Sequence, residues 1–568
     1  MNVYYAIYKN DEFVAFVNIV SELKKQQNRR IYMELKVRCS YPQKDFIPDF
    51  YQTKIVEAKY VTEGLRNEIK NWIPADPILI DAPTGKGKNT LILEECIPRA
   101  IQAKRNVLIV SNRVALSVQQ KRAVMKTTKS PMNDRLTDKG VLETETFGNV
   151  KIITYHRLRT LFEDKDNEEW LRKVMFVILD EAHFFIADSL FNEYCGYYLE
   201  QIVWRFSNAI RIYLTATSWD VLYPIAEAEK NKFHQFVKPN YWQPPRKCLR
   251  YYFPRDFSNY KLNFISSIDD IPFLIESSQN TKWLIFIDNK EKGRKLANEI
   301  GNKCAYLDSE SKGNEVWKQI TENQKFNKQI LVTTSVLDNG VSIVDDGLKN
   351  IVVFTDSRTS IIQMIGRKRC KENEIVNLWV CDVPFDKAQH YYQEYLKLYE
   401  WYKRFDNCHD ELDRHRLASK IWSADNPKLR KLFGIGRGKL FENKMARFSV
   451  ESKIDFYKNI IEGKTTFQNS VQEWLGKPIE QPSRYVDKLI DFCNEHLGNH
   501  LSENECKKLR FLIVKSYEEA GNKEPQKSRL SDLKERALNT RLAAIGIDFK
   551  IVSTNQQWIL CKSSEEVL

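Results

Sequence analysis

The stretch ILIDAPTGKGKNT, residues 78–90, decides the fold of the surrounding chain. Its first residues form a short apolar run that ends at Asp81, as in a buried parallel strand. A glycine-rich turn follows, and Lys88 begins a helix-prone segment. Such a unit binds anions, because backbone N–H groups and the helix dipole face the phosphates. We therefore predict a phosphate-binding loop, with Lys88 bridging the β- and γ-phosphates. The loop comprises Ala82, Pro83, Thr84, Gly85, Lys86, Gly87, Lys88, Asn89 and Thr90.

Two positions of this loop differ from the usual phosphate-binding pattern. Ala82 stands where the first glycine is expected, and Asn89 replaces the serine or threonine whose hydroxyl normally coordinates Mg²⁺. Either the carbonyl of Asn89 or, after a small change of register, the hydroxyl of Thr90 can supply the missing oxygen ligand. Both residues are therefore candidate metal ligands.

A second apolar run, VMFVIL at residues 174–179, ends in the acidic pair Asp180 and Glu181. A buried strand places such a pair at the carboxyl edge of a parallel sheet, where ligands bind. The two carboxylates can divide the chemistry: Asp180 holds Mg²⁺ directly or through water, and Glu181 orients and deprotonates the attacking water. The alternative is a plain helix cap, since acidic residues are common in a first helical turn.

Apolar runs alternate with helix-prone stretches in two successive parts of the chain, which predicts parallel sheets covered by helices on both faces. The strands expected are residues 78–81, 107–111, 151–154, 174–180 and 211–215 in the first part, and 283–287, 330–334, 350–355 and 376–381 in the second. A proline-containing linker at 238–247 separates the two parts. The predicted fold is therefore α/β, with two tandem parallel-sheet domains.

The two ends of the chain differ from this pattern. Residues 3–8 and 13–19 flank a turn and predict a β-hairpin, and a charged, helix-prone stretch follows from Ser21. Beyond residue 386 the chain is mainly helix-prone, with one strand expected at 548–552. We predict a small N-terminal α+β unit at 1–60, α/β domains at 61–240 and 248–385, and a mainly helical C-terminal region at 386–568.

The composition indicates a globular protein with a polyanionic partner. Of its 568 residues, 88 are Lys or Arg and 75 are Asp or Glu, which gives a net charge of +13 at pH 7 and favours nucleic acid. The eleven cysteines form no CxxC pair, so we expect neither a zinc site nor a disulfide framework. Because the sequence shows neither a signal peptide nor a membrane-spanning apolar run, we expect a cytoplasmic protein.

The order of these motifs resembles that of the superfamily 2 helicases, the DEAD/DEAH-motif ATPases with two RecA-like domains. Six further segments fit the motifs of that family: VLIVSNR at 107–113, ITYH at 153–156, LTAT at 214–217, LIFID at 284–288, TTSVLDNGVSI at 333–343 and QMIGR at 363–367. Each is weak alone, but their order over roughly half of the chain is specific. The resemblance implies ATP-dependent helicase or translocase activity in a cleft between two RecA-like domains, with ATP and Mg²⁺ as cofactors and nucleic acid as partner.

The resemblance also implies roles for individual residues. Gln363 and Arg367 join Lys88 and Glu181 in catalysis, with Arg367 offsetting charge on the γ-phosphate, and Gly340 contributes to the nucleotide site. The residues implied in nucleic-acid contact are Arg113, Thr154, His156 and Thr334. Those implied in coupling the state of the nucleotide to domain movement are His183, Thr215 and Thr217.

The QMIGR motif departs from the family three residues after Arg367, where Cys370 replaces a second arginine. Lys368, Arg369 and Lys371 surround this position, and the sequence leaves open which of them acts as the second finger. Together with Asn89, the change admits an ATP-gated binding scaffold with weakened hydrolysis as an alternative to an active motor.

DNA is the preferred substrate, because no glutamine-containing adenine motif precedes Ala82 and the LTAT motif is similar to those of DNA-acting branches. An RNA helicase and a translocase that does not unwind are the alternatives. Residues 96–133 contain eight basic and no acidic residues, which predicts a phosphate-binding surface around Arg113. A second basic cluster at 428–447 contains GIGRGK at 434–439, for which we predict a flexible loop that contacts nucleic acid.

Overall fold

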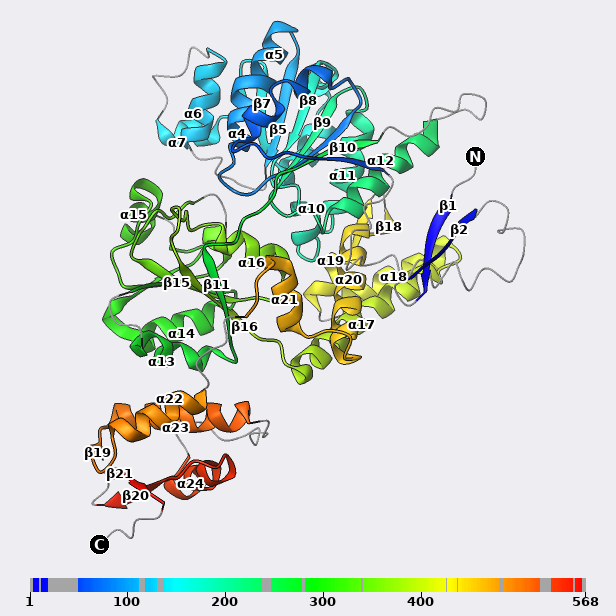
Figure 1. Cartoon of the computed structure of the whole chain (residues 1–568). Coiled ribbons are helices and arrows are strands. Elements are labelled where there is room, and N and C mark those ends of the chain that lie inside the picture. Colours follow the sequence, from blue (N-terminus) through cyan, green and yellow to red (C-terminus); the bar gives the residue numbers. More distant parts are fainter. Residues whose placement is uncertain are drawn as a thin grey trace.

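The computed structural model describes residues 4–9, 12–18, 50–111, 118–129, 137–236, 247–277, 281–311, 313–338, 341–424, 426–436, 438–479, 485–520, 533–554 and 557–563. Two α/β lobes, each built on its own sheet, are followed by a helical region that lies against both of them and by a small C-terminal unit (Figure 1). The predicted fold class is confirmed.

The first lobe contains an eight-stranded sheet that is parallel except for one edge pair. In sheet order its strands are β3 (Tyr51–Ile55), β10 (Cys248–Tyr252), β4 (Pro77–Asp81), β9 (Ile210–Thr215), β8 (Val174–Leu179), β5 (Asn106–Ser111), β7 (Val150–Thr154) and β6 (Thr146–Phe147). The five strands predicted for this lobe are all present. Every residue of β4 and β9 is buried, as a strand covered on both faces requires.

Helices cover both faces of this sheet, and each face has its own apolar core. The α-helices of the lobe are α3 (Val61–Leu65), α4 (Lys88–Leu91), α5 (Ile97–Gln102), α6 (Val118–Thr127), α7 (Asp138–Glu143), α8 (Leu158–Glu163), α9 (Glu168–Arg172), α10 (Phe184–Ala187), α11 (Cys195–Arg205) and α12 (Leu222–Phe236). A π-helical turn, η3 (Ile92–Cys96), joins α4 to α5.

The predicted limits of the first domain, 61 and 240, need correction at both ends. β3 lies before residue 61 and β10 after residue 240, yet β10 pairs in parallel with β3 on one side and β4 on the other. The chain therefore returns to the first sheet before it enters the second lobe. Neither strand has an apolar signature: only Tyr51 of β3 is buried, because β3 is an edge strand, and three of the five residues of β10 are only half-buried.

The second lobe contains a six-stranded sheet whose paired strands are all parallel. In sheet order its strands are β11 (Tyr260–Ile265), β16 (Val376–Cys381), β15 (Leu348–Phe354), β12 (Lys282–Ile287), β14 (Ile330–Thr333) and β13 (Cys304–Leu307). The α-helices of the lobe are α13 (Ile271–Ser277), α14 (Lys290–Ile300), α15 (Glu315–Asn323) and α16 (Arg358–Ile365). The four predicted strands are confirmed, and the two edge strands β11 and β13 were not predicted.

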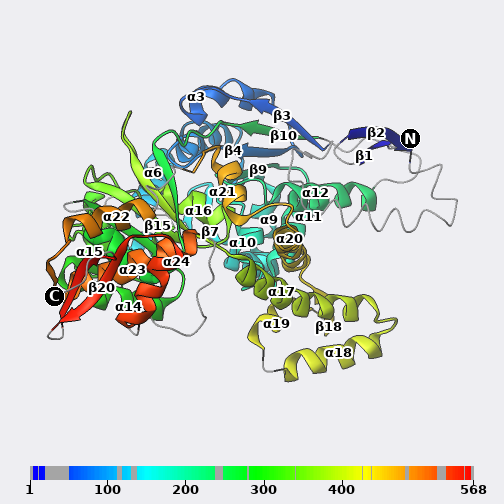
Figure 2. The same cartoon turned by 60° about the horizontal axis from the view of Figure 1, so that its bottom comes forward.

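The helical region after the second lobe contacts both lobes through one long helix, α20 (Lys444–Ile461). Just before α20, Asn443 donates from Nδ2 to the carbonyl oxygens of Ser189 (2.9 Å) and Asn192 (3.1 Å) in the first lobe. Further along, Lys453 forms a 3.0 Å ion pair with Asp356 in the second lobe. The other helices are α17 (Phe385–Asp406), α18 (Glu411–Ser423), α19 (Pro427–Lys431) and α21 (Phe467–Leu475), of which α18 and α19 project from the rest (Figure 2).

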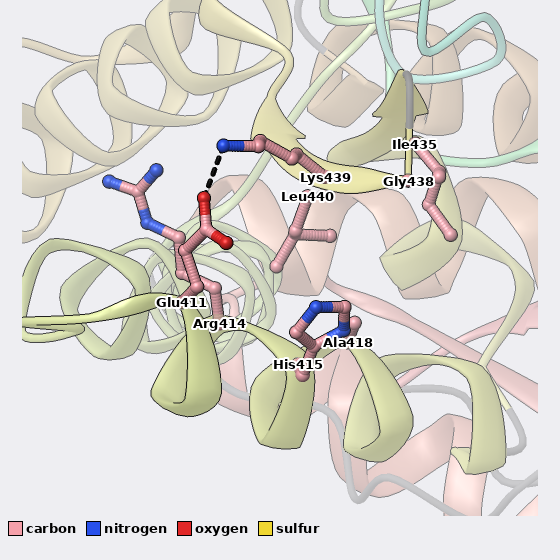
Figure 3. A pocket seen from close by; sticks show the side chains of 8 residues that line it. All are labelled: Glu411, Arg414, His415, Ala418, Ile435, Gly438, Lys439 and Leu440. Carbon is pink, nitrogen blue, oxygen red and sulfur yellow. Dashed lines mark hydrogen bonds and ion pairs between the residues drawn. The ribbon is translucent and has the colours of Figure 1, made fainter.

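The glycine-rich segment at 434–439 is not the flexible loop that we predicted. It lies in an antiparallel hairpin of β17 (Phe433–Gly436) and β18 (Lys439–Glu442) that packs against α18. A pocket lies between the hairpin and α18, and Lys439 is ion-paired with Glu411 at its rim (Figure 3). Two other lysines of the basic cluster reach the first lobe, where Lys431 pairs with Glu193 and Lys444 with Glu200. These two lysines therefore attach the helical region to the first lobe.

The C-terminal unit combines three helices with a small antiparallel sheet. Its elements are α22 (Tyr485–Glu495), β19 (His500–Leu501), α23 (Glu503–Glu519), α24 (Glu535–Ala544), β20 (Phe549–Thr554) and β21 (Gln557–Lys562). The strand predicted at 548–552 corresponds to β20. The unit lies beyond the second lobe, far from the first (Figure 1).

At the other end of the chain, β1 (Tyr4–Lys9) and β2 (Glu12–Asn18) form the predicted antiparallel hairpin. The helix predicted from Ser21 lies outside the described residues, as does the linker predicted at 238–247 apart from Lys247. None of the helices in the described parts of the chain combines the length and the apolar character that a bilayer crossing requires.

Candidate active site

The predicted phosphate-binding loop lies between β4 and α4, at the carboxyl edge of the first sheet. Gly85 and Gly87 have φ angles of +83° and +78°, in the left-handed region that favours glycine. The ammonium of Lys88 donates to the carbonyl oxygens of Ala82 (2.7 Å) and Pro83 (3.1 Å), so its side chain folds over the loop. Burial lowers the pKa of Lys88, against the opposing effect of the carboxylates of Glu181 and Asp180.

The acidic pair follows β8, next to the strand that carries the LTAT motif. The Ala182 N–H donates to the carbonyl oxygen of Leu214 in β9 (2.8 Å), which fixes the turn after the strand. Glu181 is buried and has a φ of +53°, a backbone conformation that costs a non-glycine residue about 1–3 kcal/mol. The negative charge of its carboxylate partly offsets the effect of burial on the pKa of Lys88, and one carboxylate oxygen lies 3.4 Å from Nδ1 of His183. Strand and turn thus hold Glu181 in one place at the sheet edge.

His183 links the two lobes. Its Nε2 lies 2.7 Å from the amide nitrogen of Gln363, which belongs to α16 in the second lobe. Its Nδ1 lies 3.4 Å from the hydroxyl of Thr215, and the Thr217 N–H donates to the same hydroxyl at 2.9 Å. All of these side chains are buried. The three residues predicted to couple the lobes therefore form one hydrogen-bonded group with Gln363, and Glu181 lies next to this group through its contact with His183.

The second lobe also contacts the phosphate-binding loop itself. Thr84 donates its hydroxyl hydrogen to the carbonyl oxygen of Gly366 (3.2 Å) and accepts a hydrogen bond from Nη1 of Arg369 (3.1 Å). A β-carbon added to Gly85 would lie 2.9 Å from the same Nη1, so the guanidinium lies directly against the glycine turn. The lobes therefore meet at the loop that the sequence assigns to the phosphates.

Backbone geometry explains why Arg369 faces the loop and Cys370 does not. Lys368 forms a parallel β-bridge with Ile343, which donates its N–H to the Arg367 oxygen (2.7 Å) and accepts from the Arg369 N–H (2.9 Å). Successive side chains of an extended segment point to opposite sides. Lys368 points away from the loop to Glu374 (2.9 Å), and the Cys370 thiol contacts the hydroxyl of Tyr260 (3.7 Å).

Arg367 is buried where α16 ends, between the two points at which the lobes touch. Its Nε donates to the carbonyl oxygen of Gln363 (3.1 Å), which anchors the guanidinium to the last turn of the helix. On the N-terminal side of Arg367, Gln363 contacts His183, and on the C-terminal side, Arg369 contacts Thr84. Lys88 and Arg367 thus belong to segments that meet at one interface between the lobes.

A buried charge cluster lies beneath the loop and was not predicted from the sequence. Asp81 is fully buried and forms ion pairs with Arg250 (2.8 Å) and with Arg255. Burial would raise the pKa of Asp81, but the two guanidinium groups hold it below its usual range. Arg255 also donates to the carbonyl oxygen of Ala216 in the LTAT motif (2.7 Å). The two arginines lie 169 and 174 residues after Asp81 in the sequence, so only the acidic end of β4 could have suggested the cluster.

The residues predicted to contact nucleic acid differ in accessibility. Thr154 ends β7 and is half-buried, and His156 is exposed, with Nδ1 lying 3.2 Å from the amide of Asn192. Thr334 is buried, and its hydroxyl accepts from the Val336 N–H at 3.5 Å, so its side chain is not available at the surface. Arg113 and Gly340 lie outside the described residues.

The remaining predicted ligands lie on the first turn of α4, where Asn89 is half-buried and Thr90 is exposed. Two members of the basic stretch at 96–133 have internal partners: Lys121 donates to the Leu142 and Thr144 carbonyl oxygens, and Arg105 donates to those of Lys173 and Val174. The stretch is therefore only partly a solvent-facing charge surface.

Comparison with known families agrees with this geometry. Residues 51–219 match the family described as type III restriction enzyme, res subunit, and residues 266–370 match the helicase conserved C-terminal domain. The chain is a superfamily 2 helicase. It accordingly binds ATP, is an ATP hydrolase, and is an ATP-dependent helicase or translocase of nucleic acid. The first match begins at Tyr51, the first residue of β3, in agreement with the corrected limit of the lobe.

Solved structures similar to this helicase share little sequence with it. Dbp5 of S. cerevisiae bound to RNA and ADP BeF3 is 14% identical, with 59% of this chain and 90% of that chain covered and a TM-score of 0.39. Mss116p bound to ssRNA and AMP-PNP is 16% identical, with 85% and 96% covered and a TM-score of 0.42. T. fusca Cas3 with AMPPNP is 11% identical, with 71% and 55% covered and a TM-score of 0.46. No curated protein sequence matches the helicase.

Proposed function

We propose that the helicase hydrolyses Mg²⁺–ATP at the interface of its lobes and uses the cycle to move along DNA. The observation that carries this proposal is the contact of His183 with Gln363, which joins the segment that follows β8 in one lobe to α16 of the other. A group that spans the interface in this way transmits any change at Glu181 directly to the second lobe.

The side chains at the interface suggest a division of work during hydrolysis. Lys88, freed from the two loop carbonyls that it contacts here, would bind the β- and γ-phosphates. Glu181 would take the proton of the attacking water, and Arg367 would offset the charge that develops on the transferred phosphoryl group. Arg369, which already touches the phosphate-binding loop, would act as the second cationic group in place of the missing arginine at position 370.

The donor set near the loop fits a magnesium ion. Asp180 supplies a carboxylate, and Asn89 or Thr90 supplies an amide or hydroxyl oxygen from the first turn of α4. No cluster of three or more His, Cys, Asp or Glu side chains suited to a metal occurs among the described residues. Mg²⁺ is usually held by one or two carboxylates together with waters and substrate phosphates, and the carboxylate of Asp180 can serve in this way. When bound, the ion would neutralise phosphate charge.

For the nucleic-acid path we propose the surface around Thr154 and His156, with contacts to the backbone of one strand, and on the sequence motif alone we add Arg113 to the residues that bind it. Phosphate contacts give affinity without sequence preference, as movement along a strand requires. DNA is preferred to RNA on the sequence features given above. We place the protein in the cytoplasm, supported by the ten described cysteines, all of which are free thiols.

The deciding experiment measures the ATPase rate of the full chain against single- and double-stranded DNA and RNA at stated salt concentrations. We expect stimulation by nucleic acid, strongest with DNA, and its loss in Glu181→Gln and Lys88→Ala. The matched control is Glu163→Gln, which alters an exposed glutamate of α8 that is ion-paired with Arg159. A folded protein that shows no response to either polymer would refute the proposal. Tight ATP binding without turnover, unchanged in Glu181→Gln, would instead identify a scaffold.

Strand separation needs its own readout, since a translocase can move without unwinding. Displacement of a labelled strand distinguishes a helicase, whereas displacement of a bound roadblock protein without strand release identifies a non-unwinding translocase. RNA-specific stimulation would identify an RNA helicase.

A further inference from the structure

The C-terminal unit has an order of helices and strands that the ATPase function of the two lobes does not require. Its chain runs α22, β19, α23, α24, β20, β21, and the sheet order is β19-β21-β20. Three helices thus share one apolar core with a hairpin whose second strand pairs with the short strand that precedes α23. This is the order of a winged-helix fold, in which the third helix and the hairpin lie side by side.

Helix α24 is turned away from the rest of the protein. Helix α23 attaches the unit to the second lobe, since Phe511 stacks on Phe273 with ring centroids 4.3 Å apart and Lys515 pairs with Asp270 (3.3 Å). Helices α22 and α23 lie between the second lobe and α24 (Figure 1). The inner face of α24 is therefore buried in its own unit and its outer face meets solvent.

The outer face of α24 carries one long cation and otherwise small side chains. Leu538 and Leu542 are buried in the core of the unit, whereas Arg536, Thr540 and Ala543 are exposed at spacings of four and three residues, on one side of the helix. Lys534, immediately before the helix, is also exposed. A helix with small residues on its outer face can approach a partner closely along its whole length.

An unusual side-chain contact fixes α24 against the hairpin. The Asn539 amide donates from Nδ2 to the Ile551 carbonyl oxygen at 2.8 Å, and its Oδ1 accepts from the Ile551 N–H at 2.8 Å. β20 is an edge strand, so these two backbone groups have no neighbouring strand to bond. The amide of Asn539 takes that place and holds helix and hairpin in one orientation.

Charge is unevenly distributed over the unit. Helices α22 and α23 carry more acidic than basic residues. The half formed by α24, β20 and β21 is cationic: its basic residues are Lys534, Arg536, Arg541, Lys550 and Lys562, and its acidic residues are Glu535 and Asp548. The exposed helix thus lies on the half that favours a polyanion.

We propose that the outer face of α24 binds the major groove of duplex DNA, at a site separate from the nucleotide cleft. A helix about 10–12 Å across fits the B-form major groove, which is about 12 Å wide. The deep, narrow major groove of an RNA duplex does not admit side chains in this way. Arg536 can bond guanine or phosphate, Thr540 can bond a base edge, and the Ala543 methyl can contact the thymine methyl. Lys534 supplies a phosphate contact.

The test is an anisotropy titration of the full chain without nucleotide, using a labelled 30-base-pair DNA duplex at several salt concentrations. The variant is Lys534→Ala/Arg536→Ala. The matched control is Lys507→Ala/Lys508→Ala, which removes the same charge from exposed positions of α23. We expect the variant to bind the duplex at least tenfold more weakly. The slope of log K against log salt should fall by about 0.9 if Arg536 bonds guanine, and by about 1.8 if Arg536, like Lys534, contacts a phosphate. We expect the control to bind like the wild type.

Three outcomes would overturn the proposal: unchanged duplex affinity in the variant, an equal loss in the control, or an RNA duplex of the same sequence bound as tightly as DNA. Circular dichroism of both variants checks that the fold is kept. Because the assay contains no ATP, its failure would leave the ATPase proposal standing. Conversely, loss of ATPase activity in Glu181→Gln does not bear on this site.

Discussion

Nη1 of Arg369 lies 3.1 Å from the hydroxyl oxygen of Thr84, so a guanidinium of the second lobe reaches the phosphate-binding loop of the first. The family pattern places the second arginine one residue later, where this chain has Cys370. An arginine at 370 would not replace Arg369, because side chain 370 lies on the side of the segment that faces Tyr260. Position 369 thus holds the only side chain between 368 and 371 whose described contacts reach that loop.

Replacement of Arg369 tests this assignment. We expect Arg369→Ala to lower kcat for ATP hydrolysis by about 10³-fold, the lower end of what an arginine finger contributes, with a smaller effect on KM. Lys371→Ala is the control, since Lys371 is an exposed cation that pairs with Asp346. Steady-state ATPase kinetics with saturating nucleic acid measure both variants.

A double variant shows whether the position of the guanidinium matters or only the presence of a positive charge. Arg369→Ala/Cys370→Arg restores the family pattern but places the guanidinium on the wrong side of the segment. We expect no recovery of kcat, whereas Arg369→Lys, which keeps the charge on the correct side, recovers part of it. Full recovery of kcat in the double variant would show that the segment changes its orientation when ATP binds. It would also show that Arg369 is not the arginine that offsets the phosphate charge.

Asp81 is expected to contribute strongly to the stability of the first lobe, because this buried carboxylate pairs with two arginines. Asp81→Asn leaves Arg250 and Arg255 without their shared carboxylate, and breaking a buried ion pair costs about 3–5 kcal/mol. We expect the midpoint of the first unfolding transition to shift to a much lower urea concentration. We also expect weaker ATP binding, because the phosphate-binding loop follows β4 directly. The control is Glu57→Gln at an exposed carboxylate that follows β3, for which a change within about 0.5 kcal/mol is expected. Equal stability of the two variants would contradict a structural role for the cluster.

The pH dependence of stability should report on Glu374, which anchors the Arg367–Cys370 segment through Lys368. Burial opposes ionisation, but the bonds from Lys368, the Lys371 N–H and Lys349 lower the pKa of Glu374 to about 2. Since the folded pKa lies below the ordinary value of 4.5, the stabilisation is complete above pH 4.5 and is lost as the pH falls toward 2. The pKa change from 4.5 to about 2 corresponds to a stabilisation of the folded state by about 3 kcal/mol.

The measurement compares thermal unfolding of the wild type and Glu374→Gln between pH 6 and pH 2.5. The gap between their midpoints should be widest above pH 4.5 and should narrow on acidification. The difference between the two proteins is the relevant quantity, because other carboxylates, such as Asp308, titrate in the same range. A gap that stays constant with pH would show that Glu374 acts through packing alone.

The strands that carry the site could be predicted from the sequence, because the apolar pattern that forms them leads directly into the functional residues. The continuous apolar runs of β4, β8 and β9 could be predicted because a central parallel strand is buried on both faces, and the acids after β8 follow from the same geometry. Strands β3 and β10 could not be predicted, because an edge position and partial burial remove the apolar signature. The sequence also could not choose among Lys368, Arg369 and Lys371, because that choice depends on pairing with Ile343, which is distant in the sequence.

The Asn539 amide provides a final prediction, which concerns the C-terminal unit. Asn539→Ala removes both hydrogen bonds to Ile551 and leaves a buried edge-strand residue without these partners, at a cost of about 1–3 kcal/mol. We expect faster hydrogen exchange in β20 and α24, and weaker duplex DNA binding although every basic residue remains. Asn494→Ala, on α22, is the control. If β20 exchanges as slowly in Asn539→Ala as in the wild type, then the apolar core alone sets the orientation of α24, and the amide is not what positions this helix.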